Sequence, residues 1–313
     1  MNVTAGAATD LAAAVTALRA GGLVAMPTET VYGLGADARN PAALRKVYAL
    51  KDRPADHPLI LHLADAAALP QWVVEVPPAA QALAARFWPG PLTLVLRRAP
   101  GVLDELTGGQ DSVAIRVPSH PVAQALLRAF GGGIAAPSAN RYGRVSPTRA
   151  AHVREEFPEG IAVILEGGDC EVGLESTIVS LLGPVPQLLR PGVIGGAALE
   201  AVLGVAVAGV AAEPAPRVPG STAQHYAPRT PLELVPAGGL AAASARAAGE
   251  GLRVATLACP PGSDAATYGR GLYASLRELD TRGVDRLLIE AVPTTPEWEA
   301  VRDRLMRAAA TFR

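Results

Sequence analysis

Residues 23–35 read LVAMPTETVYGLG, which places a short apolar run directly before a polar loop. Residues 23–26 predict a buried strand, and Pro27 ends it. The loop is rich in threonine and ends in two glycines, Gly33 and Gly35, behind a tyrosine. A threonine-rich turn can simply cap backbone groups. Because this one follows a buried strand, we expect it to hold a ligand close to the backbone.

The same mixture of short strands and capped helices continues along the chain as far as residue 203. We expect helices at 9–20 (capped by Thr9), 41–50 (capped by Asn40), 78–88 and 121–130, with another starting at Ser146. We expect strands at 59–63, 92–96, 113–117, 134–136, 162–165, 177–182 and 187–189. Several strands follow one another directly. This order predicts an α/β fold with a twisted, open, mixed sheet.

The composition changes after residue 203. Residues 204–228 are rich in glycine, alanine, valine and proline, as is typical of a linker. Strands at 232–235, 252–257 and 284–289 then alternate with helices at 240–248, 264–279 and 296–310. This alternation predicts a small, doubly wound, Rossmann-like parallel-sheet domain. We therefore expect a catalytic domain at 1–203, a linker at 204–228 and a C-terminal domain at 229–313.

Overall composition narrows the classes of function. Half of the 313 residues are hydrophobic, 18% are charged and the net charge is −1, so we expect a folded protein without a broad basic surface. Cys170 and Cys259 have no metal-type or disulfide-type spacing. The longest apolar run, 201–212, is too short to span a bilayer. We expect a cytoplasmic protein with no membrane contact.

Lys51-Asp52-Arg53 is the most informative charged cluster, because lysine occurs at only two positions, 46 and 51. A lysine ammonium is a movable point charge for phosphate, whereas an arginine guanidinium is a rigid fork. The pair therefore suits a phosphate site. A solvated charge cluster at a helix end, where cations favour the helix dipole, fits the tripeptide equally well.

Two further side chains stand within predicted strands. Arg116 lies among apolar residues, so it needs an anionic partner, either a structural carboxylate or one from a substrate. His62 alternates with Leu61 and Leu63 and so faces away from them. A lone histidine in such a place is more often a satisfied hydrogen-bonding group than a ligand-binding one.

Taken together and in order, five segments closely resemble the YrdC-like family. They are Pro27–Gly35, Lys51-Asp52-Arg53, Ser138-Ala139-Asn140, Leu174-Glu175-Ser176-Thr177 and Leu189-Arg190-Pro191-Gly192. The resemblance covers about residues 10–200, and His225-Tyr226-Ala227-Pro228 with the domain after it resembles the family's long two-domain type. That family makes threonylcarbamoyl-AMP for the modified adenosine beside the anticodon of certain transfer RNAs.

The resemblance implies a nucleotidyltransferase that converts L-threonine, bicarbonate and ATP to threonylcarbamoyl-AMP and pyrophosphate. It implies that ATP is bound by Lys51, Arg53, His57, Ser112, Ala136, Asn140, Ser146, Arg190 and Tyr226. It implies that L-threonine is bound by Thr30, His62, Arg116, Ser138 and Ser176, and it assigns catalytic roles to Lys51, Arg53, Ser138 and Asn140. Mg²⁺ is expected to accompany ATP, although the sequence shows no carboxylate set to hold it.

The resemblance also implies a role for the linker and a partner for the product, and other classes of protein remain as alternatives. We expect the linker to fold over the pocket so that Tyr226 contacts the nucleotide, the alternative being a simple spacer. The product is expected to pass to a tRNA-modifying transferase complex, while direct contact with tRNA or double-stranded RNA is only weakly supported by a near-neutral charge. Three other classes of protein are alternatives: an RNA-binding module, a larger carbamoyl-transferring maturation factor with zinc elements, and a regulator that keeps only the fold.

Overall fold

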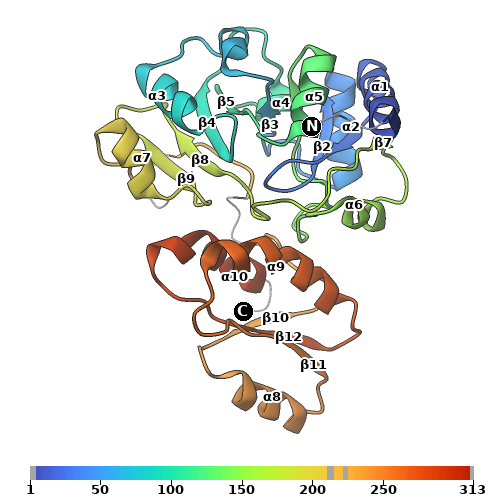
Figure 1. The fold of residues 1–313 in the computed structure, drawn as a ribbon, viewed down its shortest axis with the longest axis vertical. Helices are drawn as coiled ribbons and strands as arrows, with labels where there is room; N and C mark the ends of the chain where they lie inside the picture. Colours follow the sequence, from blue (N-terminus) through green and yellow to red (C-terminus); the bar gives the residue numbers. More distant parts are fainter. Residues whose placement is uncertain (1–4, 210–214, 221–224, 311–313) are drawn as a thin grey trace.

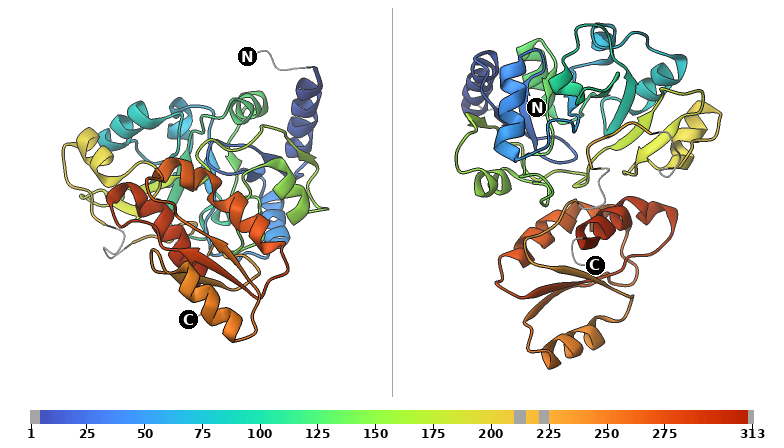
Figure 2. Two further views of the ribbon diagram at one scale, coloured as in Figure 1. Left: turned by 60° about the horizontal axis from the view of Figure 1, so that its bottom comes forward. Right: turned by 180° about the vertical axis from the view of Figure 1, so that it is seen from behind.

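The computed structural model describes residues 5–209, 215–220 and 225–310. They form two sheets in separate parts of the chain, the larger followed by the smaller (Figure 1). The views in Figure 2 show helices α9 and α10 of the smaller part facing the larger part. Within the described residues, no helix has the length and apolar character needed to cross a membrane. The expected α/β class, with a mixed sheet and a small parallel sheet, is confirmed.

The large sheet contains nine strands within the described residues, in the order β7-β1-β2-β6-β3-β5-β4-β8-β9. Parallel and antiparallel pairs alternate irregularly across it: β3 and β5 are parallel, whereas β4 and β5 are antiparallel. The strands are β1 (Val24–Met26), β2 (Gly33–Asp37), β3 (Ile60–His62), β4 (Leu92–Arg97), β5 (Ser112–Arg116), β6 (Ile134–Ala135), β7 (Val163–Ile164), β8 (Thr177–Ser180) and β9 (Gln187–Arg190).

Helices cover this sheet and leave part of one face for the pocket. They are α1 (Ala5–Arg19), α2 (Pro41–Lys51), η1 (Ala66–Gln71), α3 (Pro78–Phe87), α4 (Asp104–Thr107), α5 (Pro121–Phe130), α6 (Ala150–Glu156) and α7 (Gly196–Leu203). The main core forms where α2, α3 and α7 bury apolar residues against leucines of the central strands. On the opposite face, Ile60, Ala114 and Ile178 are instead covered by linker residue Val218.

The C-terminal domain has a three-stranded parallel sheet in the order β10-β12-β11. Helix α8 lies on one side of it, and α9 and α10 lie on the side toward the large sheet (Figure 1). Alternation along β12 explains this arrangement, because Leu287 and Ile289 join the core under α9 and α10 while Leu288 joins the one under α8. The elements are β10 (Leu232–Val235), α8 (Leu240–Gly249), β11 (Val254–Leu257), α9 (Ala265–Asp280), β12 (Arg286–Glu290), η2 (Pro296–Trp298) and α10 (Glu299–Ala309).

Local sequence signals have mixed outcomes. The predicted Asn40 cap is confirmed, since its side chain accepts hydrogen bonds from the amides of Ala42 and Ala43. The predicted Thr9 cap is wrong, because α1 already begins at Ala5. The helix predicted to start at Ser146 begins only at Ala150, and the Ser146 hydroxyl instead donates to the carboxylate of Glu175.

The expected loop at 27–35 is shorter than predicted, because Gly33 to Gly35 belong to β2. Glycine is a poor strand former, yet a Cβ at Gly33 would lie 3.0 Å from the Cβ of Ala136. The close approach of the backbone segment at Ala136 therefore explains why glycine occupies position 33. Residues 27–32 remain as the connection between the antiparallel strands β1 and β2.

Candidate active site

Strand register brings the polar residues of the large sheet to one face. His62 on β3 is the partner of Arg116 on β5, and Arg116 is also the partner of Thr93 on β4. Ile60, two residues before His62, projects to the same face. The alternate residues of these strands lie in the main core on the other face. Three short strands therefore supply a polar patch with an apolar backing.

A pocket with a cavity volume of about 40 Å³ lies over this face. The polar connection before β2 forms one wall, and the described linker residues form another. The residues lining it are Thr28, Thr30, Val31, Gly33, Arg53, Ile60, His62, Arg116, Ala136, Pro137, Ser138, Glu175, Ser176, Arg190, Pro219, Gly220, His225 and Tyr226.

Arg116 has the structural carboxylate that its strand position required. Its Nη2 lies 2.7 Å from Oε1 of Glu29, and both side chains are almost fully buried. Nη1 donates to the hydroxyl of Thr30 at 2.7 Å, and Nε donates to the carbonyl of Gly90 at 3.1 Å. Burial raises the pKa of Glu29, but Arg116 lowers it further, so the carboxyl stays ionised. Of the two partners considered for Arg116, the structural one is present.

His62 is buried beside this ion pair. Burial, and then the charge of Arg116, lowers its pKa to about 3, so the ring is neutral near pH 7. Nδ1 lies 3.1 Å from the carbonyl oxygen of Ile60. His62 is therefore both a satisfied hydrogen-bonding group and a lining residue of the pocket.

Lys51 is the last residue of α2 and is buried. Its ammonium donates to the carbonyl of Ser138 at 2.5 Å and to the carbonyl of Asn140. This placement corrects the expectation of a mobile charge, because the side chain anchors the loop 138–140 and does not line the pocket. Burial, followed by the charge of Arg53, holds the pKa of Lys51 well below its usual value.

Arg53 and Arg190, like Arg116, are buried guanidinium groups that line the pocket. Arg53 Nη2 donates to the carbonyl of Pro58 at 2.8 Å. Arg190 donates from Nη1 to the carbonyl of Pro219 at 2.9 Å and from Nη2 to the hydroxyl of Ser176 at 3.1 Å. Among the described residues, no carboxylate lies within ion-pair distance of either arginine.

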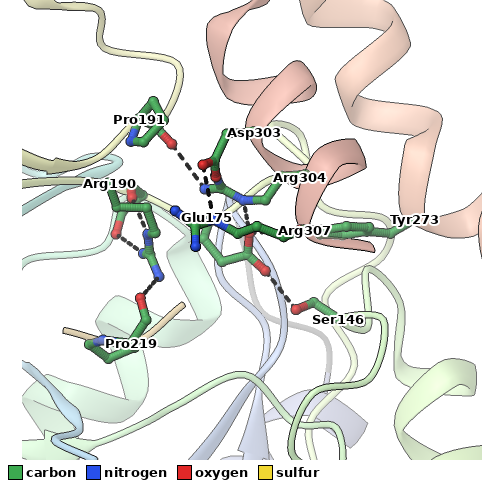
Figure 3. A network of polar contacts seen from close by, with 10 residues as sticks. Ser146, Glu175, Arg190, Pro191, Pro219, Tyr273, Asp303, Arg304 and Arg307 are labelled. Atoms are coloured by element: carbon green, nitrogen blue, oxygen red, sulfur yellow. Dashed lines mark hydrogen bonds and ion pairs between the residues drawn. The ribbon is translucent and has the colours of Figure 1, made fainter. Parts of the chain in front are cut away.

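Glu175 is a buried carboxylate at the edge of the pocket, and three side chains donate to it (Figure 3). Its Oε1 accepts from Ser146 Oγ at 2.6 Å. Its Oε2 accepts from Tyr273 Oη and from Arg304 Nε, each at 2.8 Å. Burial raises the pKa of Glu175, but Arg304 and then Arg190 lower it to about 2. Two of these three donors come from the C-terminal domain.

Six buried polar atoms in or near the pocket have no hydrogen-bond partner among the described residues. They are Tyr226 Oη, His225 Nδ1, Asn140 Oδ1, Arg116 Nη2 and both carboxylate oxygens of Glu29, although Arg116 Nη2 and Glu29 Oε1 are ion-paired with each other. Tyr226 also has a left-handed backbone, with φ of 62°. Buried polar atoms are normally satisfied, and strained conformations gather at functional sites, so these groups suit contact with a polar ligand.

Comparison with known proteins decides the family. The family model Sua5_yciO_yrdC, described as "Telomere recombination", matches residues 16–192. A second model, Sua5_C, described as "Threonylcarbamoyl-AMP synthase, C-terminal domain", matches residues 194–310. The chain belongs to the Sua5/YrdC family.

Relatives of this Sua5/YrdC chain match along nearly its whole length. The threonylcarbamoyl-AMP synthase of Bacillus subtilis is 40% identical over 96% of this chain and 93% of its own. That of Pyrococcus abyssi is 39% identical over 93% of this chain and 92% of its own. The crystal structure of P. abyssi Sua5 complexed with L-threonine matches with a TM-score of 0.90 and 37% identity, covering 97% of this chain and 94% of that one. The predicted long two-domain type is confirmed.

The pocket of this Sua5/YrdC protein includes nine of the fourteen residues assigned by resemblance. The nine are Thr30, Arg53, His62, Arg116, Ala136, Ser138, Ser176, Arg190 and Tyr226. The other five, Lys51, His57, Ser112, Asn140 and Ser146, do not line it. Lys51 and Ser146 act on lining residues through hydrogen bonds. His57 contacts the hydroxyl of Tyr142 at 3.1 Å, and Ser112 lies at the far end of β5. Their ligand roles remain predictions.

Sequence reasoning missed several residues of the site. Glu29 and Glu175 lie within the motifs quoted from the sequence. An acidic residue next to a buried strand could have indicated that each belongs to the site. Tyr273 and Arg304 had no such signal, because each is ordinary in its own helix and acquires its partner only when the domains meet.

The described residues do not offer a protein cage for a metal. No group of three or more His, Cys, Asp or Glu side chains that could hold a metal ion is present among them. Glu29 is ion-paired with Arg116 through Oε1, and Glu175 accepts hydrogen bonds from three donors. The described residues therefore identify no ligand set for Mg²⁺, and its arrival with ATP stays a prediction.

Proposed function

We propose that this protein is an L-threonylcarbamoyladenylate synthase. The amino nitrogen of L-threonine combines with bicarbonate, with loss of water, to form a carbamate. A carbamate oxygen then attacks the α-phosphorus of ATP, and the bond to the β-phosphate oxygen breaks to release pyrophosphate. The activity is the one for which its curated relatives are named.

The charge of the pocket carries this proposal. Arg53 and Arg190 are buried cations that line it, and their described partners include carbonyl and hydroxyl oxygens but no carboxylate at ion-pair distance. Burying a charge without a counter-ion is unfavourable, so a site of this kind is stabilised by an anionic ligand. The triphosphate of ATP has the required charge. Positioned cations are also what transfer at phosphorus requires.

The residues divide into two groups in this proposal. Arg53 and Arg190 face the phosphates, with Lys51 holding the Ser138–Asn140 loop in place. Thr30, His62, Arg116, Ser138 and Ser176 receive L-threonine. Arg116 donates two hydrogen bonds in the structure, from Nε and Nη1, and its Nη2 is ion-paired with Glu29, so N–H groups are left to donate to the substrate carboxylate.

The linker closes the pocket in this proposal. Pro219, Gly220 and Tyr226 already line it, and the free Tyr226 hydroxyl is available to the nucleotide. Such a cover would exclude water from a labile carbamate and adenylate.

Mg²⁺ would arrive with ATP, and no step is assigned to a protein-held ion. We place the enzyme in the cytoplasm, with its product passing to a tRNA-modifying transferase complex. Direct contact with RNA is not required.

The test is pyrophosphate release from ATP by the full chain, with L-threonine and bicarbonate omitted in turn. Release is expected only when both are present, together with a product whose mass is that of threonylcarbamoyl-AMP. Release that continues without either substrate would contradict the proposal. Salt-dependent RNA binding without threonine-dependent release would instead favour an RNA-binding module.

A further inference from the structure

Arg304 of the C-terminal domain is a fully buried cation directed at the catalytic domain. Its Nε donates to Glu175 at 2.8 Å, and its Nη2 donates to the carbonyl of Pro191 at 3.0 Å (Figure 3). Nη1 lies 2.6 Å from Oδ2 of Asp303. Its guanidinium carbon also lies 5.0 Å from the ring centre of Tyr226. One side chain therefore joins α10 to the residue that follows β9, to the pocket edge and to the linker residue Tyr226.

Glu175 needs such a partner because of where it lies. It lines the same pocket as Arg53 and Arg190, the cations assigned to the phosphates. An ionised carboxylate there would repel a bound polyphosphate. A neighbouring cation that binds the carboxylate cancels much of that repulsion, and in a buried site the effect extends over several ångströms.

The donors to Glu175 also connect it with ligand-facing groups. Ser146 is assigned to the nucleotide, and its hydroxyl donates to Oε1. Tyr273 donates to Oε2, and its ring stacks on Tyr226 with centres 5.9 Å apart. A change at Glu175 would therefore reach Ser146, which does not itself line the pocket, and the linker residue Tyr226, which does.

We propose that the C-terminal domain completes the nucleotide site, with Arg304 as the positioning residue that neutralises and orients Glu175. Tyr273 supports it by holding the same carboxylate oxygen. This inference rests on the proposed function and gives the C-terminal domain a role in ATP binding. Arg304 touches no substrate and acts through Glu175 and Tyr226.

The experiment uses the full chain carrying Arg304→Met, which keeps much of the side-chain volume but removes the charge. We expect the KM for ATP to rise by about tenfold or more, with a smaller change in the KM for L-threonine. The double variant Glu175→Gln/Arg304→Met removes both charges and should recover most of the ATP affinity. A residue that only stabilised the fold would not show this rescue. Arg253→Met, which removes an exposed ion pair with Asp285 in the same domain, is the matched control.

Tyr273→Phe is a milder variant, since it removes one donor and keeps the ring. We expect it to raise the KM for ATP about two- to fivefold. Unchanged ATP KM in folded Arg304→Met overturns the inference. If that variant does not fold, unchanged ATP KM in Tyr273→Phe does so. ATP affinity measured by calorimetry separates the two proposals: a wild type that binds ATP but makes no adenylate contradicts the proposed function alone.

Discussion

Lys51 lies at the end of α2, and its ammonium holds the 138–140 loop through two backbone carbonyls. Both Lys51 and Arg53 are buried, so the alternative of a solvated charge cluster at a helix end is wrong. The sequence alone could place the cation beside this motif. It could not show whether the ammonium points to ligand or to backbone, because that depends on where two distant loops meet.

We predict that Lys51→Ala abolishes pyrophosphate release and also lowers the free energy of unfolding by about 2 kcal/mol or more. Two carbonyls lose their donor in a buried place, and each unsatisfied group is unfavourable. Urea unfolding and steady-state turnover measure the two effects.

The other lysine is the control for that prediction. Lys46 makes one hydrogen bond, to the carbonyl of Gly21 at 2.7 Å, and lies outside the pocket. Lys46→Ala should lower stability by about 1 kcal/mol and leave the KM for ATP unchanged. Normal turnover in Lys51→Ala would show that the loop does not depend on this ammonium.

At the level of elements, periodicity predicted most strands and helices within a few residues. β2 was missed because its glycines have low strand propensity. The reason for glycine at position 33 is the close approach of Ala136, which lies far away in the sequence. The part of the linker at 215–220 was predicted from composition, but its packing on Ile60, Ala114 and Ile178 depends on long-range contacts. A local sequence pattern cannot predict such contacts.

Gly220 tests the linker's role in the pocket. It has φ of 79°, and an added Cβ would lie 2.0 Å from Tyr226 Oη. Gly220→Ala should therefore displace Tyr226 and raise the KM for ATP about tenfold or more. Nucleotide titration of the full chain measures the effect.

Gly204→Ala is the matched control for the linker prediction. Gly204 has a similar φ of 69°, but no atom lies within 4 Å of an added Cβ. It should lose about 1 kcal/mol of stability from backbone strain and bind ATP normally. Equal ATP affinity in the two alanine variants would leave the linker as a spacer.

Across the whole molecule, contacts between the domains are polar as well as apolar. Arg277 of α9 donates to the carbonyl of Val145 at 2.5 Å and lies 3.1 Å from Glu156, with both side chains mostly buried. The composition of the second domain predicted its fold. It could not predict these contacts, because they join residues more than 100 positions apart.

Arg277→Met should lower the free energy of unfolding by about 3 kcal/mol, because Glu156 is left as a buried charge without its partner. Arg282→Met removes an exposed ion pair with Glu278 and should change it by less than about 1 kcal/mol. Chemical denaturation of both variants makes the comparison. Similar losses would mean that the Arg277 contact contributes little to joining the domains.

Buried histidines give the whole molecule a pH dependence. Burial lowers the pKa of His62 and His225 to about 3 and that of His152 to about 4. The unfolded chain binds protons at these groups below about pH 6.5, whereas the folded chain does not. The stability that they contribute is therefore fully present above pH 6.5 and is lost as the pH falls toward 3 or 4.

His152 allows that pH dependence to be tested away from the pocket lining. Between pH 7 and pH 5, the loss in free energy of unfolding should be about 2 kcal/mol smaller in His152→Gln than in the wild type. Urea unfolding of both proteins at both pH values gives the four free energies of unfolding that the comparison needs. An identical loss in both proteins would show that His152 is not kept neutral by the fold.

The ion pair between Arg304 and Glu175 also sets an order on biosynthesis. Its two residues are 129 positions apart, and the carboxylate is made first. At about 5–20 residues per second, the ribosome needs roughly 6–26 s to add the arginine. Throughout that interval the nascent catalytic domain carries Glu175 without Arg304, and we therefore predict that the proposed nucleotide pocket matures only when α10 docks. Proteolysis of nascent chains stalled before and after α10 would reveal this delay.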